Sequence, residues 1–363
     1  MCGGCTLPGV PYADQLAKKQ KELSRLLQRD VPPLIPSPAE SGFRSKVAFV
    51  FAPGPKGKGV VMGHYALGSQ RVIPIDECPV HHARGNRIAF TLRDHLQKAN
   101  VGALLRHVIV RTTEDGGEAS AMLVVYRNDK SLRPPVKKFL ASTEKPDGFF
   151  VNIHDKPGPF MVGDETIKIE GRSHVKEMVN GVSYLVSPTA FFQTNVGVAA
   201  AIVKLVLEAI GQIDKPAGLS SHVLDLYCGT GLFALQLAKA GAKVTAIEEN
   251  RQAIKDAEAN VRLNRIAEER IRLIAGKVEE LVKGQFDAVV MDPPRQGCPP
   301  RVLSAVFDQM RPTKVVYVSC NPNALAKELP GILRAGYRVA RVQAVDMFPH
   351  TNHIETVIAF ERG

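Results

Sequence analysis

The 363-residue sequence predicts an α/β fold in two domains, an α+β domain over residues 1–185 and a doubly wound α/β domain over residues 186–363. The second half alternates almost continuously apolar strand-like runs with helix-like segments, which is typical of a buried parallel sheet covered by helices. The first half instead contains short strand-like runs separated by Gly, Pro and Asp. The chain is also long enough to form two hydrophobic cores.

In the N-terminal half, one helix precedes a series of short strands. Residues 14–29 space four leucines for one face of a helix, and four prolines within the next ten residues end it. Strands are expected at residues 46–52, 59–65, 107–113, 120–127 and 149–154. This order of elements predicts an α+β or mostly β domain.

In the C-terminal half, the pattern changes at about residue 198 to an alternation of helix and strand. Helices are expected at residues 199–210, 232–240 and 251–264, and strands at residues 222–227, 243–248, 271–276, 286–292 and 314–319. A sheet of this kind binds its ligands at the carboxyl ends of its strands. The residues that follow each apolar run are therefore the first candidates for a functional site.

The charge of the chain is asymmetric. It has 47 Lys and Arg against 36 Asp and Glu, and residues 1–185 carry 26 basic and 18 acidic side chains, a net charge of +8. Such an excess in one half is typical of a surface that attracts polyanions, among which nucleic acid is the commonest in a cytosol. A basic surface that only increases solubility explains the charge equally well.

The composition also indicates in which cellular compartment the protein is found. No apolar run reaches the ~18–20 residues needed to span a bilayer, and the first residues lack the basic and apolar regions of a signal peptide. Six cysteines in a chain of this length are too few for a disulfide framework. We therefore expect a cytoplasmic, monomeric protein that does not bind membranes, in which each cysteine is a metal ligand, a catalytic group or a buried thiol.

A glycine loop follows the first strand of the C-terminal half, in "DLYCGTGLFAL". Gly229 and Gly231 allow a tight turn and the close approach of a ligand. Glu248, at the end of the next strand, is placed to bind ribose hydroxyls, so that a dinucleotide fits this pattern. The carboxylate of Asp225 would repel a pyrophosphate but suits the cationic amine and sulfonium of S-adenosylmethionine. Asp225 could also simply cap the loop.

Two further strands are followed by residues whose side chains could take part in catalysis. Asp292 ends one strand and is followed by two prolines, which hold it rigidly at the mouth of the sheet. Cys320 follows another strand, in "KVVYVSCNPNALAKEL". A packing thiol would more naturally lie within the strand than after it, so the position of Cys320 favours a nucleophile.

The C-terminal "VDMFPHTNHIETVIAFER" offers a partner for this nucleophile. Glu355 lies among apolar residues, where burial would raise its pKa and make it a better base. A solvated carboxylate at the edge of a sheet is the alternative. We expect His350 and His353 to serve only in the packing of the loop.

Five motifs now match one family in order and spacing. "SPTAFFQTN", "DLYCGTG", "MDPPRQG", "VVYVSCNPNALAKEL" and "DMFPHTNHIE" resemble the RNA uracil-5-methyltransferases, and most closely the 23S rRNA members. The resemblance runs from residue 2 to the end of the chain. It implies a Rossmann-like, S-adenosylmethionine-dependent catalytic domain in which Cys320 is the nucleophile and Glu355 the base. The residues that it implies in contact with S-adenosylmethionine are Gln193, Tyr227, Glu248 and Asp292.

The N-terminal cysteines form a second group, Cys2-x2-Cys5 and the distant Cys78. By themselves they fit zinc, redox or iron–sulfur chemistry. In the family, this pattern belongs to a [4Fe–4S] cluster held by four cysteines, of which the first has no counterpart here. A start placed too far downstream, a cluster with three protein ligands, or a degenerate site would each explain this. The first explanation predicts a cysteine six residues before Cys2.

The resemblance therefore predicts a methyl transfer from S-adenosylmethionine to C5 of a uridine in 23S rRNA, as a step of rRNA processing. The N-terminal domain would bind the iron–sulfur cluster and RNA. Phe191 and Phe192 are candidate walls for the target base, although one of these neighbours is expected in the core. Cys228 and Cys298 are expected to be buried or incidental thiols. A tRNA substrate, a 5-methylcytosine product and a non-catalytic iron–sulfur RNA-binding protein are the alternatives.

Overall fold

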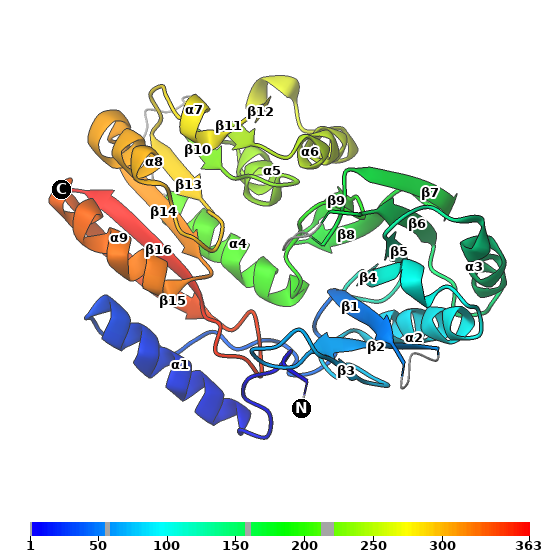
Figure 1. The fold of residues 1–363 in the computed structure, drawn as a ribbon. Helices are drawn as coiled ribbons and strands as arrows, with labels where there is room; N and C mark the ends of the chain where they lie inside the picture. Colours follow the sequence, from blue (N-terminus) through cyan, green and yellow to red (C-terminus); the bar gives the residue numbers. More distant parts are fainter. Residues whose placement is uncertain (1, 55–58, 157–160, 212–220) are drawn as a thin grey trace.

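Two seven-stranded sheets dominate the described residues of the computed structural model, which are 2–54, 59–156, 161–211 and 221–363 (Figure 1). One sheet is built from the N-terminal half of the chain and the other from the C-terminal half. No helix in these four ranges is long and apolar enough to cross a membrane.

The N-terminal sheet has the strand order β3-β2-β1-β4-β5-β6-β7, and only β5 and β6 run parallel to each other. Its strands are β1 (Lys46–Pro53), β2 (Val60–Tyr65), β3 (Val72–Pro74), β4 (Leu105–Thr112), β5 (Ala119–Val125), β6 (Gly148–Ile153) and β7 (Glu165–Gly171). The five strands expected from the sequence are present as β1, β2, β4, β5 and β6. Their apolar faces form one core together with α2 (Ala83–Gln97) and α3 (Arg133–Leu140).

The C-terminal sheet has the order β12-β11-β10-β13-β14-β16-β15. Its strands are β10 (His222–Leu226), β11 (Lys243–Glu248), β12 (Ile271–Ala275), β13 (Ala288–Met291), β14 (Lys314–Ser319), β15 (Tyr337–Val345) and β16 (Glu355–Arg362). The first five are parallel, as predicted, and the chain crosses between them through helices. The prediction of a parallel sheet is wrong at one edge, where β16 runs antiparallel to both β14 and β15.

Helices cover both faces of the C-terminal sheet. One core contains α4 (Val196–Ile210), α5 (Leu232–Lys239) and α6 (Arg251–Leu263), and the hairpin of β8 (Val175–Val179) and β9 (Val182–Val186) joins it. The other core contains α1 (Tyr12–Leu27), α7 (Val278–Leu281), α8 (Pro300–Ser304) and α9 (Pro322–Arg334), and a π-helical turn, Ala305–Met310, follows α8.

The first helix lies far from the sheet that follows it in the sequence. Figure 1 shows α1 beside α9 and β15, and Leu23 and Leu27 of α1 belong to the same core as Leu325 and Leu329 of α9. The burial of Leu23 and Leu27 on one face explains why this segment is helical. As a consequence, the beginning of the chain packs against its C-terminal part.

Candidate active site

Cys320 and Glu355 lie near each other, at adjoining ends of the neighbouring strands β14 and β16. β14 ends at Ser319, and Ser319 pairs with Thr356 in the antiparallel ladder with β16. Cys320 directly follows this last paired residue of β14, Glu355 directly precedes Thr356, and the carboxyl group of Glu355 acts on the pKa of the Cys320 thiol. The end of the β14–β16 ladder therefore brings the thiol and the carboxyl group close together.

The thiol of Cys320 is half-buried, and its surroundings disfavour its charged form. Burial raises its pKa to about 11, and the negative charges of Glu355 and Asp292 act in the same direction. The guanidinium group of Arg295 opposes them. In the free protein at neutral pH, Cys320 is therefore a thiol rather than a thiolate.

Glu355 is almost completely removed from solvent, with 2% of its surface exposed. Burial raises its pKa well above the usual value, and the nearby carboxyl group of Asp292 adds to the rise, while Arg295 opposes it. Its Oε1 accepts no hydrogen bond from any described residue. The sequence-based expectation of a buried Glu355 with a raised pKa is confirmed, and the free oxygen points to a group that can still take up a proton.

Asp292 follows β13 and is held from two sides. The Nε2 of Gln193 donates to its Oδ2 at 3.3 Å, and Pro293 and Pro294 fix the backbone that leaves the strand. Burial raises the pKa of Asp292 to about 7. Gln193, from the motif "AFFQ" before α4, thus reaches the same place as the end of β13.

The glycine loop lies at the end of β10, as expected for a ligand-binding turn. Tyr227, Gly229 and Gly231 all have positive φ angles, of 64°, 55° and 91°. Oε2 of Glu248 accepts a hydrogen bond from the amide of Gly229 at 3.0 Å, which ties the end of β11 to the loop. A Cβ atom built on Gly229 would meet nothing within 4 Å, so this part of the loop faces open space.

Asp225 lies at the base of this loop and is fully buried. Burial raises its pKa well above the usual value, and the carboxyl groups of Asp292 and Glu248 add to the rise. Four acidic groups, Asp225, Glu248, Asp292 and Glu355, therefore interact at one edge of the sheet. Such a group of carboxyls favours a ligand that carries positive charge.

Comparisons with known proteins agree with this arrangement. The model of the tRNA (uracil-5-)-methyltransferase family matches residues 162–363. A protein of Gloeobacter violaceus named as an RNA methyltransferase is 33% identical to this chain, and the alignment covers 100% of this chain and 81% of the relative. A second, from Geobacter sulfurreducens, is 34% identical and covers 98% of this chain and 74% of its own length.

The chain belongs to the tRNA (uracil-5-)-methyltransferase family. Among solved structures, it is similar to the tRNA (uracil-54, C5)-methyltransferase of Pyrococcus abyssi in complex with S-adenosyl-L-homocysteine, with a TM-score of 0.82 and 28% identity over 99% of this chain and 86% of the other. The protein is thus an RNA methyltransferase that uses S-adenosylmethionine. The open glycine loop and the acidic groups around it fit this cationic methyl donor.

The three N-terminal cysteines of the methyltransferase line one cavity of about 640 Å³, together with Arg44, His64 and His350. Gly3 donates a backbone hydrogen bond to Tyr65 of β2, which places the first cysteine beside the N-terminal sheet. Burial raises the pKa of Cys5 and of Cys78, and the neighbouring cysteines contribute to both rises. In the part of the chain that the structure describes, however, no three or more His, Cys, Asp or Glu side chains are arranged to hold a metal ion.

The remaining predicted residues divide clearly between core and surface. Phe192 is buried with 3% of its surface exposed, whereas Phe191 is 64% exposed. Cys228 and Cys298 are both buried, as expected. Of the two neighbouring aromatic residues, only Phe191 is thus free to contact a base.

Sequence analysis of the methyltransferase missed two residues next to Cys320. Arg295 is the cation that acts on both Cys320 and Glu355, and it stands in the motif "MDPPRQG", directly after the rigid turn. Asn321 accepts hydrogen bonds from the amides of Asn323 and Ala324 at the start of α9, and its Nδ2 donates to the Arg295 carbonyl at 2.9 Å. An Asn-Pro pair before a helix-like run is a capping signal that could have revealed Asn321.

Proposed function

We propose that this methyltransferase transfers a methyl group from S-adenosylmethionine to C5 of a uridine in 23S rRNA, with Cys320 as nucleophile and Glu355 as base. The observation that carries the proposal is that the ladder of β14 and β16 ends directly beside Cys320 and Glu355, so that a buried carboxyl group acts on the thiol. A nucleophile that follows one strand and a base that begins its neighbour can act on neighbouring atoms of one ring.

The chemistry of uracil explains why both groups are needed. C5 is a weak nucleophile, so the Cys320 thiolate adds to C6 and produces an enolate in which C5 is reactive. When bound, S-adenosylmethionine supplies an electrophilic methyl group. After C5 has been methylated, Glu355 accepts the C5 proton, the C5–C6 double bond forms again, and the C6–S bond breaks to release the Cys320 thiolate.

The binding site of the methyl donor is assigned to the glycine loop and the residues around it. We infer that Gln193, Tyr227, Glu248 and Asp292 bind it, with Glu248 on the ribose hydroxyls. The hydrogen bond that Glu248 accepts from the Gly229 amide supports this role, because it places the carboxylate within the loop. Asp292 and Gln193 are already in contact with each other, which supports a shared ligand.

We assign RNA binding to the basic N-terminal domain, residues 1–185, and catalysis to residues 186–363. A paired or stacked uridine hides C6, so the target base must be extruded or lie in a loop. The exposed ring of Phe191, two residues before Gln193, supports a stacking role against this base.

The choice of 23S rRNA is supported by the group Cys2, Cys5 and Cys78, which resembles the cysteines of the 23S rRNA members. We propose that these thiols supply three of the four ligands of a [4Fe–4S] cluster, and their shared cavity supports this proposal. A cluster separates its thiolate ligands more widely than a single ion does, so the lack of a compact ion site does not conflict with it. The second candidate substrate is tRNA, and the similarity to the Pyrococcus abyssi enzyme favours it.

Covalent capture tests the catalytic part of the proposal. RNA that contains 5-fluorouracil should form an adduct that resists denaturation, because fluorine at C5 cannot leave as a cation. Cys320→Ala should abolish this adduct. If the alanine variant still forms it, another nucleophile is at work.

A second variant tests the base. Glu355→Gln keeps the shape of the side chain but removes the proton acceptor, so addition and methylation should proceed while elimination stops. The variant should accumulate a covalent complex with ordinary RNA. Normal turnover without such a complex would contradict the role of Glu355.

Mass spectrometry of RNA from a deletion strain distinguishes the substrates. Loss of one 5-methyluridine from 23S rRNA, with tRNA unchanged, is the expected result. Loss from tRNA alone would favour the second candidate, and loss of 5-methylcytosine would show that the base has been assigned wrongly.

A further inference from the structure

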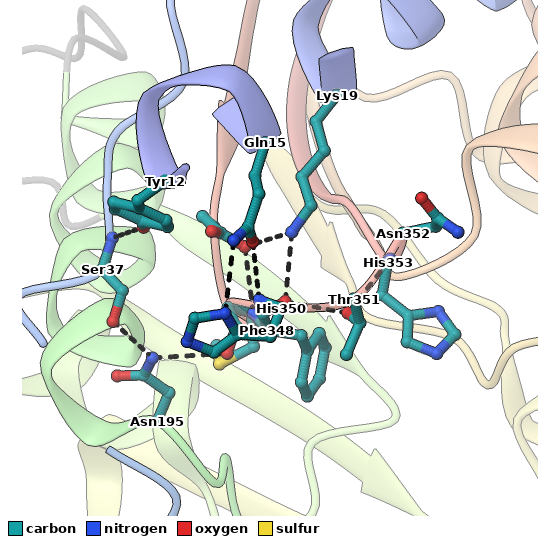
Figure 2. A network of polar contacts seen from close by, with 12 residues as sticks. Tyr12, Gln15, Lys19, Ser37, Asn195, Phe348, His350, Thr351, Asn352 and His353 are labelled. Atoms are coloured by element: carbon teal, nitrogen blue, oxygen red, sulfur yellow. Dashed lines mark hydrogen bonds and ion pairs between the residues drawn. The ribbon is translucent and has the colours of Figure 1, made fainter. Parts of the chain in front are cut away.

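The loop that leads into Glu355 is held by residues from the start of the chain. Residues 346–354 join β15 to β16, and Figure 2 shows them facing the side chains of Gln15 and Lys19 of α1. The partners lie more than 300 positions apart in the sequence. The loop that ends at Glu355 is therefore held by contacts that its own sheet does not supply.

His350 is the centre of these contacts, because all of its polar groups are occupied. Its amide donates to Oε1 of Gln15 at 2.7 Å, and its carbonyl accepts from the amides of Thr6 and Leu7 at 2.9 Å each. Its Nε2 lies 2.8 Å from the Glu40 carbonyl and its Nδ1 lies 3.2 Å from Nε2 of Gln15. Since a carbonyl only accepts, the ring carries its proton on Nε2 and accepts from Gln15 on Nδ1.

The backbone of His350 is strained in this position. Its φ angle is 64°, in the left-handed region that non-glycine residues seldom adopt. Strain of this kind persists only where the surroundings impose it, and it is concentrated at functional sites. Here the imposing contacts come from Gln15, Thr6, Leu7 and Glu40.

Other contacts fix the loop before and after His350. At its start, Nζ of Lys19 donates to Oδ1 of Asp346 at 2.6 Å and to the Phe348 carbonyl at 3.1 Å. Towards its end, the amide of Asn352 donates to Oγ1 of Thr6 at 3.0 Å. The loop is thus fixed along its length, to a point three residues before Glu355.

The same N-terminal segment carries two of the cavity cysteines. Cys2 and Cys5 line the cavity that His350 also lines, and Thr6 follows Cys5 directly. The cysteine cavity and the loop before Glu355 therefore share one short stretch of chain.

We propose that His350 is a positioning residue, through which the N-terminal segment sets the place of the Glu355 carboxyl group. The inference rests on the proposed role of Glu355 as base. The carboxylate must lie within hydrogen-bond reach of the C5 proton, and a small displacement slows proton transfer strongly. We expect the effect of His350 in the elimination step, in which Glu355 takes up the C5 proton.

The test compares the adduct with ordinary RNA in His350→Ala, Gln15→Ala and Glu355→Gln. The two positioning variants should eliminate about tenfold more slowly than the wild type, which corresponds to about 1.4 kcal/mol. They should accumulate the denaturation-resistant adduct, with KM for RNA unchanged. His350→Asn should recover part of the rate, because asparagine tolerates the left-handed conformation.

Arg311→Ala is the matched control. Arg311 also has a positive φ angle, of 50°, but it precedes the other end of β14, so its variant has the same backbone strain without a contact to the loop. Thermal unfolding of each variant measures the purely structural effect.

The outcomes distinguish a failure of the positioning role of His350 from a failure of the proposed role of Glu355 as base. If Glu355→Gln traps the adduct while His350→Ala and Gln15→Ala turn over like Arg311→Ala, the positioning role is wrong and the proposed function stands. If Glu355→Gln turns over normally, both fail together. Adduct accumulation in His350→Ala and Gln15→Ala, but not in Arg311→Ala, supports the positioning role.

Discussion

At the scale of single residues, burial and opposing charges together determine the reactivity of Cys320. Burial and the carboxyl groups of Glu355 and Asp292 disfavour the thiolate, whereas Arg295 favours it. Only the thiolate adds to C6. Each pH unit below the pKa of Cys320 therefore reduces the fraction of thiolate tenfold. A pKa of about 11 therefore predicts an addition rate that rises with pH through the whole neutral range.

The first prediction concerns Arg295. Arg295→Ala removes the only cation that is found to lower the pKa of Cys320 among the described residues, so this pKa should rise further. At pH 8, alkylation of Cys320 by iodoacetamide should slow by about two- to tenfold, a moderate effect because the arginine is exposed. Arg295→Lys keeps the charge and should react almost like the wild type.

Peptide mass spectrometry over a range of pH measures this alkylation at Cys320 separately from the other cysteines. Equal pH profiles for Arg295→Ala and the wild type would show that the guanidinium group does not act on the thiol.

At the scale of elements, the sequence predicted the five parallel strands of the C-terminal sheet, each within one or two residues. β10, β13 and β14 are buried along almost their full length, whereas β11 and β12 are buried only in part. β15 was missed because exposed residues interrupt it and its ladder with β16 shifts between Val339 and Arg341. An apolar pattern also carries no strand direction, which explains why the antiparallel edge was not predicted.

The second prediction concerns the start of α9. Asn321→Ala removes a cap that accepts two backbone hydrogen bonds, and should lower the free energy of unfolding by about 1 kcal/mol. Asn250→Ala removes an equivalent cap from α6 and should cost a similar amount. Only the first variant should also alter the alkylation of Cys320, because Asn321 links Cys320 to the Arg295 carbonyl.

Urea unfolding of the two variants, with alkylation measured under native conditions, tests this prediction. A change in Cys320 reactivity of the same size in Asn250→Ala would mean that general loosening, and not the cap, controls the thiol.

At the scale of the whole molecule, the sequence predicted part of the site and missed what supports it. Cys320 and Asp292 could be placed together because both follow parallel strands of one sheet. The contact between α1 and the loop before Glu355 could not, because no local pattern links Gln15 to His350 or Lys19 to Asp346. Such pairs arise only when the two ends of the chain meet.

The last prediction concerns this meeting of the two ends. Lys19 and Asp346 form an ion pair with side chains only 2% and 0% exposed, and burial lowers the pKa of Lys19. Lys19→Met leaves the Asp346 carboxylate buried without its cation, so it should lower the free energy of unfolding by about 3–5 kcal/mol. Lys19→Met combined with Asp346→Leu removes both charges and should recover much of this loss.

Urea unfolding measures the free energy of unfolding of the single and the double variant. The exposed pair of Arg25 and Glu22 on the same helix supplies the control, because Arg25→Met should cost less than about 1 kcal/mol. A Lys19→Met variant as stable as Arg25→Met would show that the pair does not join α1 to the C-terminal sheet. A double variant no more stable than Lys19→Met would show instead that the contacts of Lys19 with the Phe348 carbonyl, and not the paired charge, hold the two ends together.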